Sequence, residues 1–186
     1  MTGQPLRRNG LPGGEPTALM FAVHKGHGEV IDQLVKANAD VDKADQDGFT
    51  ALMVAAQNGH GEVIEQLVKA KANVDKTNEK GFTALMLAAL NGHGAAIEQL
   101  VKANADVDKA NPRDRTALML AALNGHGAAL EQLVKANADI DKADSLGFTA
   151  LMLAAQNGHG AAIEQLVKAN TDVDKADPRG LTALML

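Results

Sequence analysis

The feature of this chain that most limits its fold is an internal repeat with a period of 33 residues. Residues 48–80 read GFTALMVAAQNGHGEVIEQLVKAKANVDKTNEK, and most of the chain consists of close copies of this stretch. Five full units are followed by a partial one, at 15–47, 48–80, 81–113, 114–146, 147–179 and 180–186. A fixed period of this size predicts a solenoid, in which each unit packs only against its neighbours.

Each unit contains the signals for two short helices, as residues 48–80 illustrate. Thr50 is suited to cap a helix over 51–57, which Asn58-Gly59 ends. A second helix over 62–69 has an apolar stripe at helical spacing, formed by Val63, Ile64, Leu67 and Val68. Helices of about ten residues are marginal alone, so the units must stack to bury these stripes. The sequence therefore predicts an all-α repeat solenoid.

The exposed side of the second helix is marked by an acid and a base four residues apart, Glu65 and Lys69. Such a pair stabilises a helix best when the acid comes first. Equivalent pairs occur in the other units: Asp32/Lys36, Glu98/Lys102, Glu131/Lys135 and Glu164/Lys168. This repetition predicts the same solvent-facing side in every unit.

The polar segment 71–80 connects the second helix to the next unit and has one apolar anchor, Val74. This pattern predicts an extended loop or a hairpin. The residue at the end of the second helix is asparagine in four units, at Asn38, Asn104, Asn137 and Asn170. Asparagine tolerates the left-handed conformation that ends many helices. Lys71 stands at this place in unit 48–80, and we expect strain on the order of 1 kcal/mol there.

Composition excludes several classes of function. The chain has no cysteine, which excludes disulfides, thiolate zinc sites and a cysteine nucleophile. Its net charge is −5 with acids and bases interspersed, and no basic block predicts nucleic-acid binding. No run approaches the roughly 18 apolar residues of a membrane-spanning helix. We therefore expect no cofactor, no nucleic acid and no membrane among its partners.

Residues 1–14 differ from the repeats. They contain Pro5, Pro12 and four glycines, a composition that predicts a flexible lead-in. They lack the apolar core of a signal peptide. Together with the absence of cysteine, this favours the cytoplasm or another reducing compartment.

The unit resembles the ankyrin repeat. Its motifs T-A-L-M-x-A-A, N-G-H and A-D-V-D lie where that family has T-P-L-H-x-A-A, N-G-H and A-D-V-N, and the resemblance covers residues 15–186. Four positions depart from the pattern: Ala51 replaces a proline, Met53 a histidine, Gly61 a leucine and Asp75 an asparagine. We expect the fold to survive, with a looser core at the glycine sites and without the threonine–histidine bonding of the family's first motif.

The resemblance implies a stack of antiparallel helix pairs with projecting β-hairpin loops. It also implies a non-enzymatic function. In this family, the hairpin tips and the concave face of the first helices usually bind another protein.

The histidines form a ladder with one member per unit, at His27, His60, His93, His126 and His159. Neighbouring helices pack about 8–10 Å apart, whereas zinc ligands lie about 2.0–2.3 Å from the metal. Histidines of successive units therefore cannot share a zinc ion. We expect each ring to cap the turn between the two helices by bonding to a loop carbonyl.

Two other patterns resemble metal sites, but both are better explained by structure. Residues 40–48, DVDKADQDG, resemble a calcium loop, but that loop would need acids at the positions of Lys43 and Val54. A methionine column more often packs in a core than binds a soft metal; its members are Met20, Met53, Met86, Met119, Met152 and Met185. No nucleophile–base–acid set stands out, so we expect no enzymatic activity.

Positions that vary between otherwise similar units predict where a partner binds. The column before the loop glycine consists of Asp47, Lys80, Arg113, Leu146 and Arg179. The column after it consists of Pro16, Phe49, Phe82, Arg115, Phe148 and Leu181. A column in the first helix consists of His24, Gln57, Leu90, Leu123 and Gln156. From these columns we predict the partner-binding set Asp47, Phe49, Gln57, Lys80, Phe82, Leu90, Arg113, Arg115, Leu123, Leu146, Phe148 and Gln156.

An apolar patch flanked by Arg113 and Arg115 is expected within this set, formed by Phe82, Leu90, Leu123, Leu146 and Phe148. Such patches and arginine anchors are typical of interaction sites. The alternative is that the phenylalanines pack along the hairpins and the variation is drift. A second class of function also remains open, a structural spacer or an engineered, consensus-like array without a dedicated partner. Units 81–113 and 147–179 share 30 of 33 residues, which favours this second class.

The sequence stops at Leu186, partway into a sixth unit. Terminal repeats normally carry polar caps, whereas a first helix without its second helix leaves an apolar face open. We expect either that the chain is cut from a longer array or that this end pairs with another molecule, including end-to-end self-association.

Overall fold

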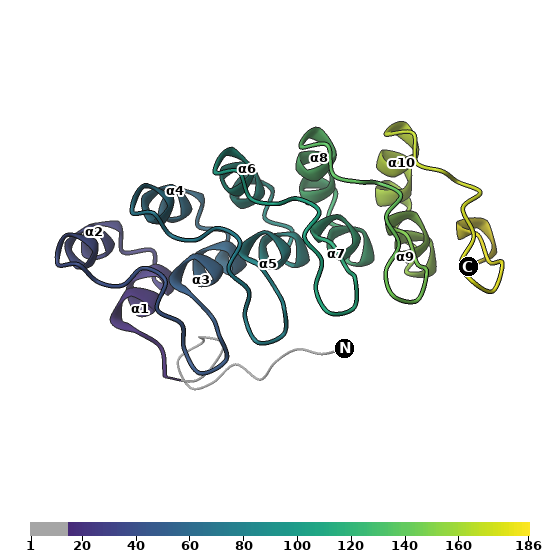
Figure 1. Cartoon of the computed structure of the whole chain (residues 1–186). Helices are drawn as coiled ribbons and strands as arrows, with labels where there is room; N and C mark the ends of the chain where they lie inside the picture. Colours follow the sequence, from purple (N-terminus) through teal and green to yellow (C-terminus); the bar gives the residue numbers. More distant parts are fainter. Residues whose placement is uncertain (1–14) are drawn as a thin grey trace.

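The computed structural model describes residues 15–186 and confirms the predicted stack of helix pairs (Figure 1). The prediction of a flexible lead-in at 1–14 lies outside the described residues. The helices are α1 (Ala18–His24), α2 (Gly28–Lys36), α3 (Ala51–Asn58), α4 (Gly61–Lys69), α5 (Ala84–Leu90), α6 (Gly94–Lys102), α7 (Ala117–Leu123), α8 (Gly127–Lys135), α9 (Ala150–Gln156), α10 (Gly160–Lys168) and a final 3₁₀ turn η1 (Ala183–Met185). Figure 1 shows the odd-numbered helices in one row, the even-numbered helices in a second row, and the loops extending beyond the odd-numbered row.

The first helix of each full unit begins after a threonine cap, as predicted. The Thr50 hydroxyl accepts the backbone N–H of Met53 at 3.3 Å. Equivalent bonds are made by Thr17, Thr83, Thr116 and Thr149. Each bond satisfies a backbone N–H that the start of a helix leaves without a partner, a contribution of about 1 kcal/mol.

The core lies between the two rows of helices. Residues 51–56 of α3 are at most 1% exposed, whereas α4 buries a stripe that includes Ile64 and Leu67. Ala55 and Ala56 are fully buried, and their small side chains let α3 pack closely against α1 and α5. The methionine column packs in the core from Met20 to Met152, while Met185 is 66% exposed. Burial of one large apolar side chain contributes about 1.5–3 kcal/mol.

The loops are hairpin-shaped turns rather than the β-hairpins that we expected. Within residues 15–186, strand-type pairing is limited to one bridge, between Ala143 and Thr149. In unit 48–80, the N–H of Asn78 donates to the carbonyl of Phe82 at 3.0 Å. The Oδ1 atom of Asn78 also accepts the N–H groups of Lys80 and Phe82, at 3.0 and 2.9 Å. A side chain therefore holds this turn closed without a β ladder.

Residues near the ends of the second helices adopt the left-handed conformation that the sequence predicts. The φ angle is +66° at Lys71. It lies between +58° and +62° at Asn38, Asn104, Asn137 and Asn170. Lys71 is therefore the member of this column whose side chain is least suited to its backbone conformation.

Two bonds tie each loop to the loop of the preceding unit. The Lys76 ammonium donates to the carbonyl of Asp42 at 2.6 Å, and the N–H of Asn73 donates to Asp42 Oδ1 at 2.9 Å. The same two bonds recur at the next three junctions, from the units of Lys109, Lys142 and Lys175 to Asp75, Asp108 and Asp141. One of these aspartates is Asp75, which stands where the ankyrin motif has asparagine. The aspartate side chain still accepts the N–H bond, and its negative charge strengthens that bond.

The outer side of the second helices is charged, as predicted. Ion pairs form between Glu65 and Lys69 and at three equivalent places, at 2.6–2.8 Å. Among residues 15–186, the fifth predicted pair, Asp32 and Lys36, does not form an ion pair; aspartate is one methylene shorter than glutamate. Exposed pairs of this kind contribute little to stability, because solvent and salt screen them. No helix among residues 15–186 has the length and apolar character needed to cross a membrane.

Candidate protein-interaction surface

The loops end in a row of tips whose side chains differ between units. We define the tips as Asp47, Lys80, Arg113, Leu146 and Arg179, each of which precedes a residue with positive φ. Asp47 is half-buried and the other four are exposed. Leu146 is 64% exposed, the largest exposed apolar side chain in the row. Four of the tips, Asp47, Lys80, Arg113 and Leu146, belong to the predicted partner-binding set, and the last three of these are exposed.

The backbone joins neighbouring tips at two junctions. The N–H of Glu79 donates to the carbonyl of Asp47 at 3.2 Å. The N–H of Ser145 donates to the carbonyl of Arg113 at 3.0 Å. Because Ser145 precedes Leu146 directly, the second bond fixes the Arg113 and Leu146 tips beside each other.

The phenylalanines are not part of an exposed patch. Phe49 and Phe148 are 4% and 9% exposed, and Phe82 is half-buried against the core. The expectation that Phe82 and Phe148 join Leu146 in one exposed apolar patch is therefore wrong. Aromatic rings at the base of a turn can bury most of their area between two units, and the alternative of packing along the hairpins describes Phe49 and Phe148.

The first-helix column lies away from the tips. Leu90 and Leu123 are half-buried against the core and occupy the last turn of their helices, about 10 Å along the axis from the hairpin end. Gln57 is also half-buried, with its Oε1 enclosed and without a hydrogen-bond partner among residues 15–186, whereas Gln156 is exposed. The structure thus separates the predicted set into a row of tips and a distant helix-end column.

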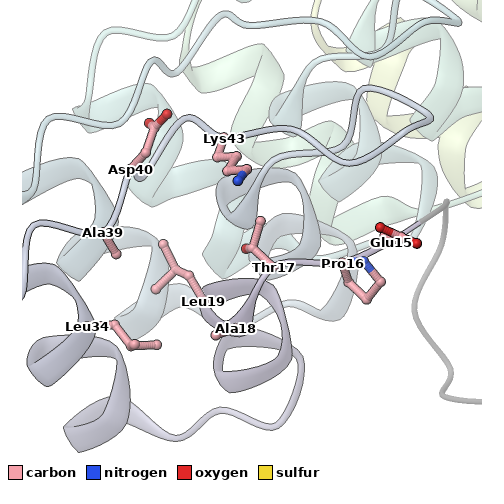
Figure 2. A pocket seen from close by; sticks show the side chains of 9 residues that line it. All are labelled: Glu15, Pro16, Thr17, Ala18, Leu19, Leu34, Ala39, Asp40 and Lys43. Carbon is pink, nitrogen blue, oxygen red and sulfur yellow. The ribbon is translucent and has the colours of Figure 1, made fainter.

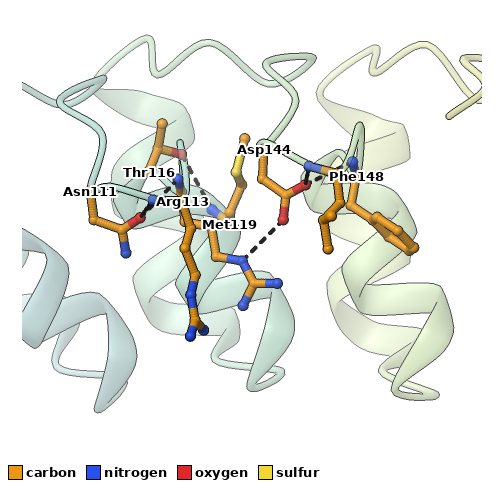
Figure 3. A network of polar contacts seen from close by, with 8 residues as sticks. Asn111, Arg113, Thr116, Met119, Asp144 and Phe148 are labelled. Atoms are coloured by element: carbon orange, nitrogen blue, oxygen red, sulfur yellow. Dashed lines mark hydrogen bonds and ion pairs between the residues drawn. The ribbon is translucent and has the colours of Figure 1, made fainter. Parts of the chain in front are cut away.

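The third turn differs from the others. Asp114 adopts φ +57° where the other four turns have glycine, and Arg115 stands where three units have phenylalanine. The Arg115 Nε donates to Asp144 Oδ2 at 3.0 Å, with the two side chains 21% and 1% exposed. Figure 3 shows the Asp144 carboxylate accepting this bond together with N–H bonds from its own turn, including that of Phe148. Arg115 is therefore a half-buried link between units rather than an exposed flank of a patch.

The residue that holds each turn forms a further column that sequence reasoning did not single out: Asp45, Asn78, Asn111, Asp144 and Asp177. An aspartate or asparagine recurs three residues before the residue with positive φ in each of these turns, and this repetition could have indicated the column. Burial raises the pKa of Asp45, partly offset by N–H bonds from Phe49 and Asp47. Bonds from the Leu181 N–H and from Arg179 lower the pKa of Asp177 despite its burial.

The histidine ladder links successive units, and its metal interpretation finds no geometric support. His93 Nε2 lies 3.0 Å from the carbonyl of Gln57, and His126 and His159 make the same contact at 3.0 and 3.1 Å. The expected bond to a carbonyl forms, but the acceptor lies at the end of the first helix of the preceding unit rather than in a loop. Among residues 15–186, no three His, Asp or Glu side chains group as metal ligands would.

An open pocket of about 450 Å³ lies beside α1. Figure 2 shows the residues that line it: Glu15, Pro16, Thr17, Ala18, Leu19, Leu34, Ala39, Asp40 and Lys43. Leu34 is half-buried there, whereas its equivalents Leu67 and Leu100 in later units are fully buried. In later units, the unit before packs against the equivalent leucine and covers it. The pocket therefore corresponds to a stacking surface of the first unit rather than to a shaped cavity for a small molecule.

In residues 180–186, the apolar side chains of Leu184 and Met185 are exposed, whereas the equivalent side chains of the full units are buried. Leu184 and Met185 are 96% and 66% exposed, whereas Leu52 and Met53 are each 1% exposed. The turn η1 contacts α9. Apolar side chains of this stretch are accessible in the structure.

Comparison with known protein families gives a match along nearly the whole chain. A family model described as ankyrin repeats (3 copies) matches residues 6–78, 66–144 and 118–186. A comparison with curated proteins finds no match. The family match, the helix pairs and the motifs of each unit agree, and the chain belongs to the ankyrin repeat family.

Proposed function

We propose that this chain is a non-enzymatic scaffold that binds a partner protein through the row of tips and the exposed positions of the first-helix face. Ankyrin repeats generally mediate protein–protein interaction. The observation that carries the proposal is the contrast within each unit. Core, cap and ladder positions repeat almost unchanged, whereas the exposed tips change from lysine to arginine to leucine.

A spacer array without a dedicated partner is the competing function. Units 81–113 and 147–179 differ at only three positions, Leu90/Gln156, Ala105/Thr171 and Asn111/Asp177. Such similarity is typical of recent duplication or of consensus-like repeats. A spacer needs a stable stack but no particular side chains at its tips.

The test compares two matched triple variants in capture from cell lysate, with bound proteins quantified by mass spectrometry. The tip variant is Lys80→Ala, Arg113→Ala and Leu146→Ala. The control variant is Lys69→Ala, Lys102→Ala and Val167→Ala on the second helices, and it also removes two positive charges and one exposed aliphatic side chain. Both variants are checked for helical circular dichroism.

A protein that the wild type and the control capture, but the tip variant does not, supports binding through the tips. Equal capture by both variants, or no specific capture by the wild type, contradicts the proposal and favours the spacer. The variants avoid Phe148 and Leu90, because replacing these packed side chains would also destabilise the fold.

A second proposal concerns self-association through residues 180–186. It is motivated by Leu184, which is 96% exposed although its equivalents in the stack are buried. Light scattering of the chain over a range of concentrations tests it, with Leu184→Ser as the comparison. A mass that rises with concentration in the wild type only supports the proposal, and a monomer at every concentration contradicts it.

A further inference from the structure

We propose that the Arg113 and Leu146 tips form a two-point docking site for an extended segment of a partner protein in which a carboxylate lies beside an aliphatic side chain. This inference rests on the proposed function above. It adds the chemistry of the partner and the two residues that recognise it.

Leu146 supplies the apolar point. It is 64% exposed at a place where the other units carry aspartate, lysine or arginine. It does not contribute to the core cluster, unlike the half-buried Leu90 and Leu123. Most of this aliphatic side chain lies outside the core of residues 15–186, and its exposed area is available to be covered by a partner.

Arg113 supplies the charged point. Arg115 is paired with Asp144, and Arg179 is paired with Asp177 and lies over the Phe148 ring. Within residues 15–186, the Arg113 guanidinium makes no ion pair, although it is exposed. The side chain of Arg113, drawn in Figure 3, belongs to the same turn as the paired Arg115. A guanidinium whose N–H groups are not engaged in an ion pair can hold a carboxylate through two parallel hydrogen bonds.

The backbone around Arg113 departs from the rule that the other units follow. Asp114 holds a left-handed conformation, φ +57°, that glycine fills in the neighbouring turns at Gly81 and Gly147. The Arg115–Asp144 pair accounts for the change at Arg115, because the two side chains bond to each other. It does not account for Asp114. Positions that break a local rule without a structural gain are enriched at functional sites.

The backbones of the two tips are held beside each other by the bond from the Ser145 N–H to the Arg113 carbonyl, at 3.0 Å. In an extended segment, alternate side chains share one face and lie about 6–7 Å apart. A glutamate two residues from a leucine therefore presents both groups to the same surface. Asp114, next to Arg113 in the chain, reduces the long-range attraction, so recognition must come from direct contact rather than from net charge.

The test is a nuclear magnetic resonance titration of the full chain with a synthetic peptide, Gly-Ser-Glu-Ser-Leu-Ser-Glu-Ser-Gly, reading the amide signals of Ser145 and Leu146. Two control peptides replace the glutamates by lysine or the leucine by serine. Protein variants are Arg113→Gln and Leu146→Ser, with Lys102→Gln as an exposed control on α6.

We expect saturable shifts at Ser145 and Leu146 with the first peptide. The dissociation constant should rise at least about fivefold with either control peptide and with either tip variant, a loss typical of a truncated anchor, and should not change with Lys102→Gln. Absent shifts at millimolar peptide, or shifts that are the same with the lysine peptide, overturn the inference. If that result occurs while the tip variant still loses a captured protein, the chemistry of the site is wrong but the proposed function stands.

Discussion

Arg115 and Asp144 connect the turns of two neighbouring repeats through a bond of 3.0 Å between Nε and Oδ2, and the carboxylate is only 1% exposed. At the preceding junction, the equivalent residues are Phe82 and Asn111, an aromatic ring and an amide. A charged contact has therefore replaced a neutral one at the same place. At the following junction the equivalent residues are Phe148 and Asp177, and Asp177 is paired instead with Arg179 of its own turn.

Arg115→Phe should lower the free energy of unfolding by about 1–3 kcal/mol, because it leaves the buried Asp144 carboxylate without its cation. The double variant Arg115→Phe with Asp144→Asn recreates the neutral combination and should recover most of the loss. Urea denaturation followed by circular dichroism measures both. If the two substitutions are additive, the pair is not energetically coupled and our interpretation of this junction is wrong.

The repeat pattern was sufficient to predict the fold because the same helix-capping, apolar and helix-ending signals recur in five units. The threonine caps, the apolar stripes and the left-handed asparagines all lie where the sequence places them. The strand content was not predictable, because one Asx side chain closes each turn and removes the need for a ladder, as at Asn78.

The candidate surface was only partly predictable. A variable column shows where units differ, but exposure depends on how the next unit packs. Phe148 and Leu146 are two residues apart, yet they are 9% and 64% exposed. The link between Arg115 and Asp144 spans two units, and only the simultaneous change in two columns could have indicated it.

Asp45→Asn should stabilise the protein at neutral pH. Burial raises the pKa of Asp45 above its ordinary value of 3.8, since Oδ2 is enclosed without a hydrogen-bond partner among residues 15–186. The ionised form is therefore penalised in the fold, and the penalty is fully present above the folded-state pKa. It disappears as the pH falls through that raised value toward 3.8. Asparagine keeps the turn bonds, as Asn78 does, so the gain should shrink toward acid pH.

Asp177→Asn is the matched control and should have the opposite sign. The Leu181 N–H and Arg179 lower the pKa of Asp177 below 3.8, so its carboxylate stabilises the fold above that value. This contribution is lost as the pH falls below 3.8 through the folded-state pKa. Unfolding curves of both variants across this range check the signs. A destabilising Asp45→Asn at neutral pH would show that the enclosed oxygen has a partner.

Two glycines, Gly59 and Gly158, separate backbone strain from crowding. Gly59 has φ +73°, and an added Cβ would lie 2.6 Å from His93 Nδ1, whereas Gly158 has φ +70° and open space. Gly158→Ala should cost about 1 kcal/mol from its left-handed backbone. Gly59→Ala should cost at least about 1 kcal/mol more, because it also displaces the His93 ring from the Gln57 carbonyl. Equal losses in urea denaturation would mean that the ring moves without cost.

Gly160→Ala should instead raise the free energy of unfolding by about 0.5–1 kcal/mol, since alanine restricts the unfolded chain and favours the helix. Gly160 begins α10, has no positive φ, and has nothing within 4 Å of an added Cβ. The comparison is Gly94→Ala at the same place in α6, where the Cβ would lie 3.1 Å from the Ala128 carbonyl. We expect a smaller gain or a loss at Gly94, and thermal denaturation of the two variants distinguishes them. A gain of equal size at both would indicate that α6 and α8 separate easily.

Lys71→Asn should stabilise the protein by up to about 1 kcal/mol, because φ is +66° there and asparagine tolerates this conformation better than lysine. The side chain of Lys71 is exposed, so the substitution changes little besides the backbone preference. Asn104→Lys is the reverse change in the next unit, where φ is +60°, and should destabilise by a similar amount. Urea midpoints of both variants and of the double variant measure the two effects. If Lys71→Asn gives no gain while Asn104→Lys is costly, then the asparagine side chain rather than its backbone preference stabilises these helix ends, and the strain at Lys71 is relieved by movement of the loop that follows it.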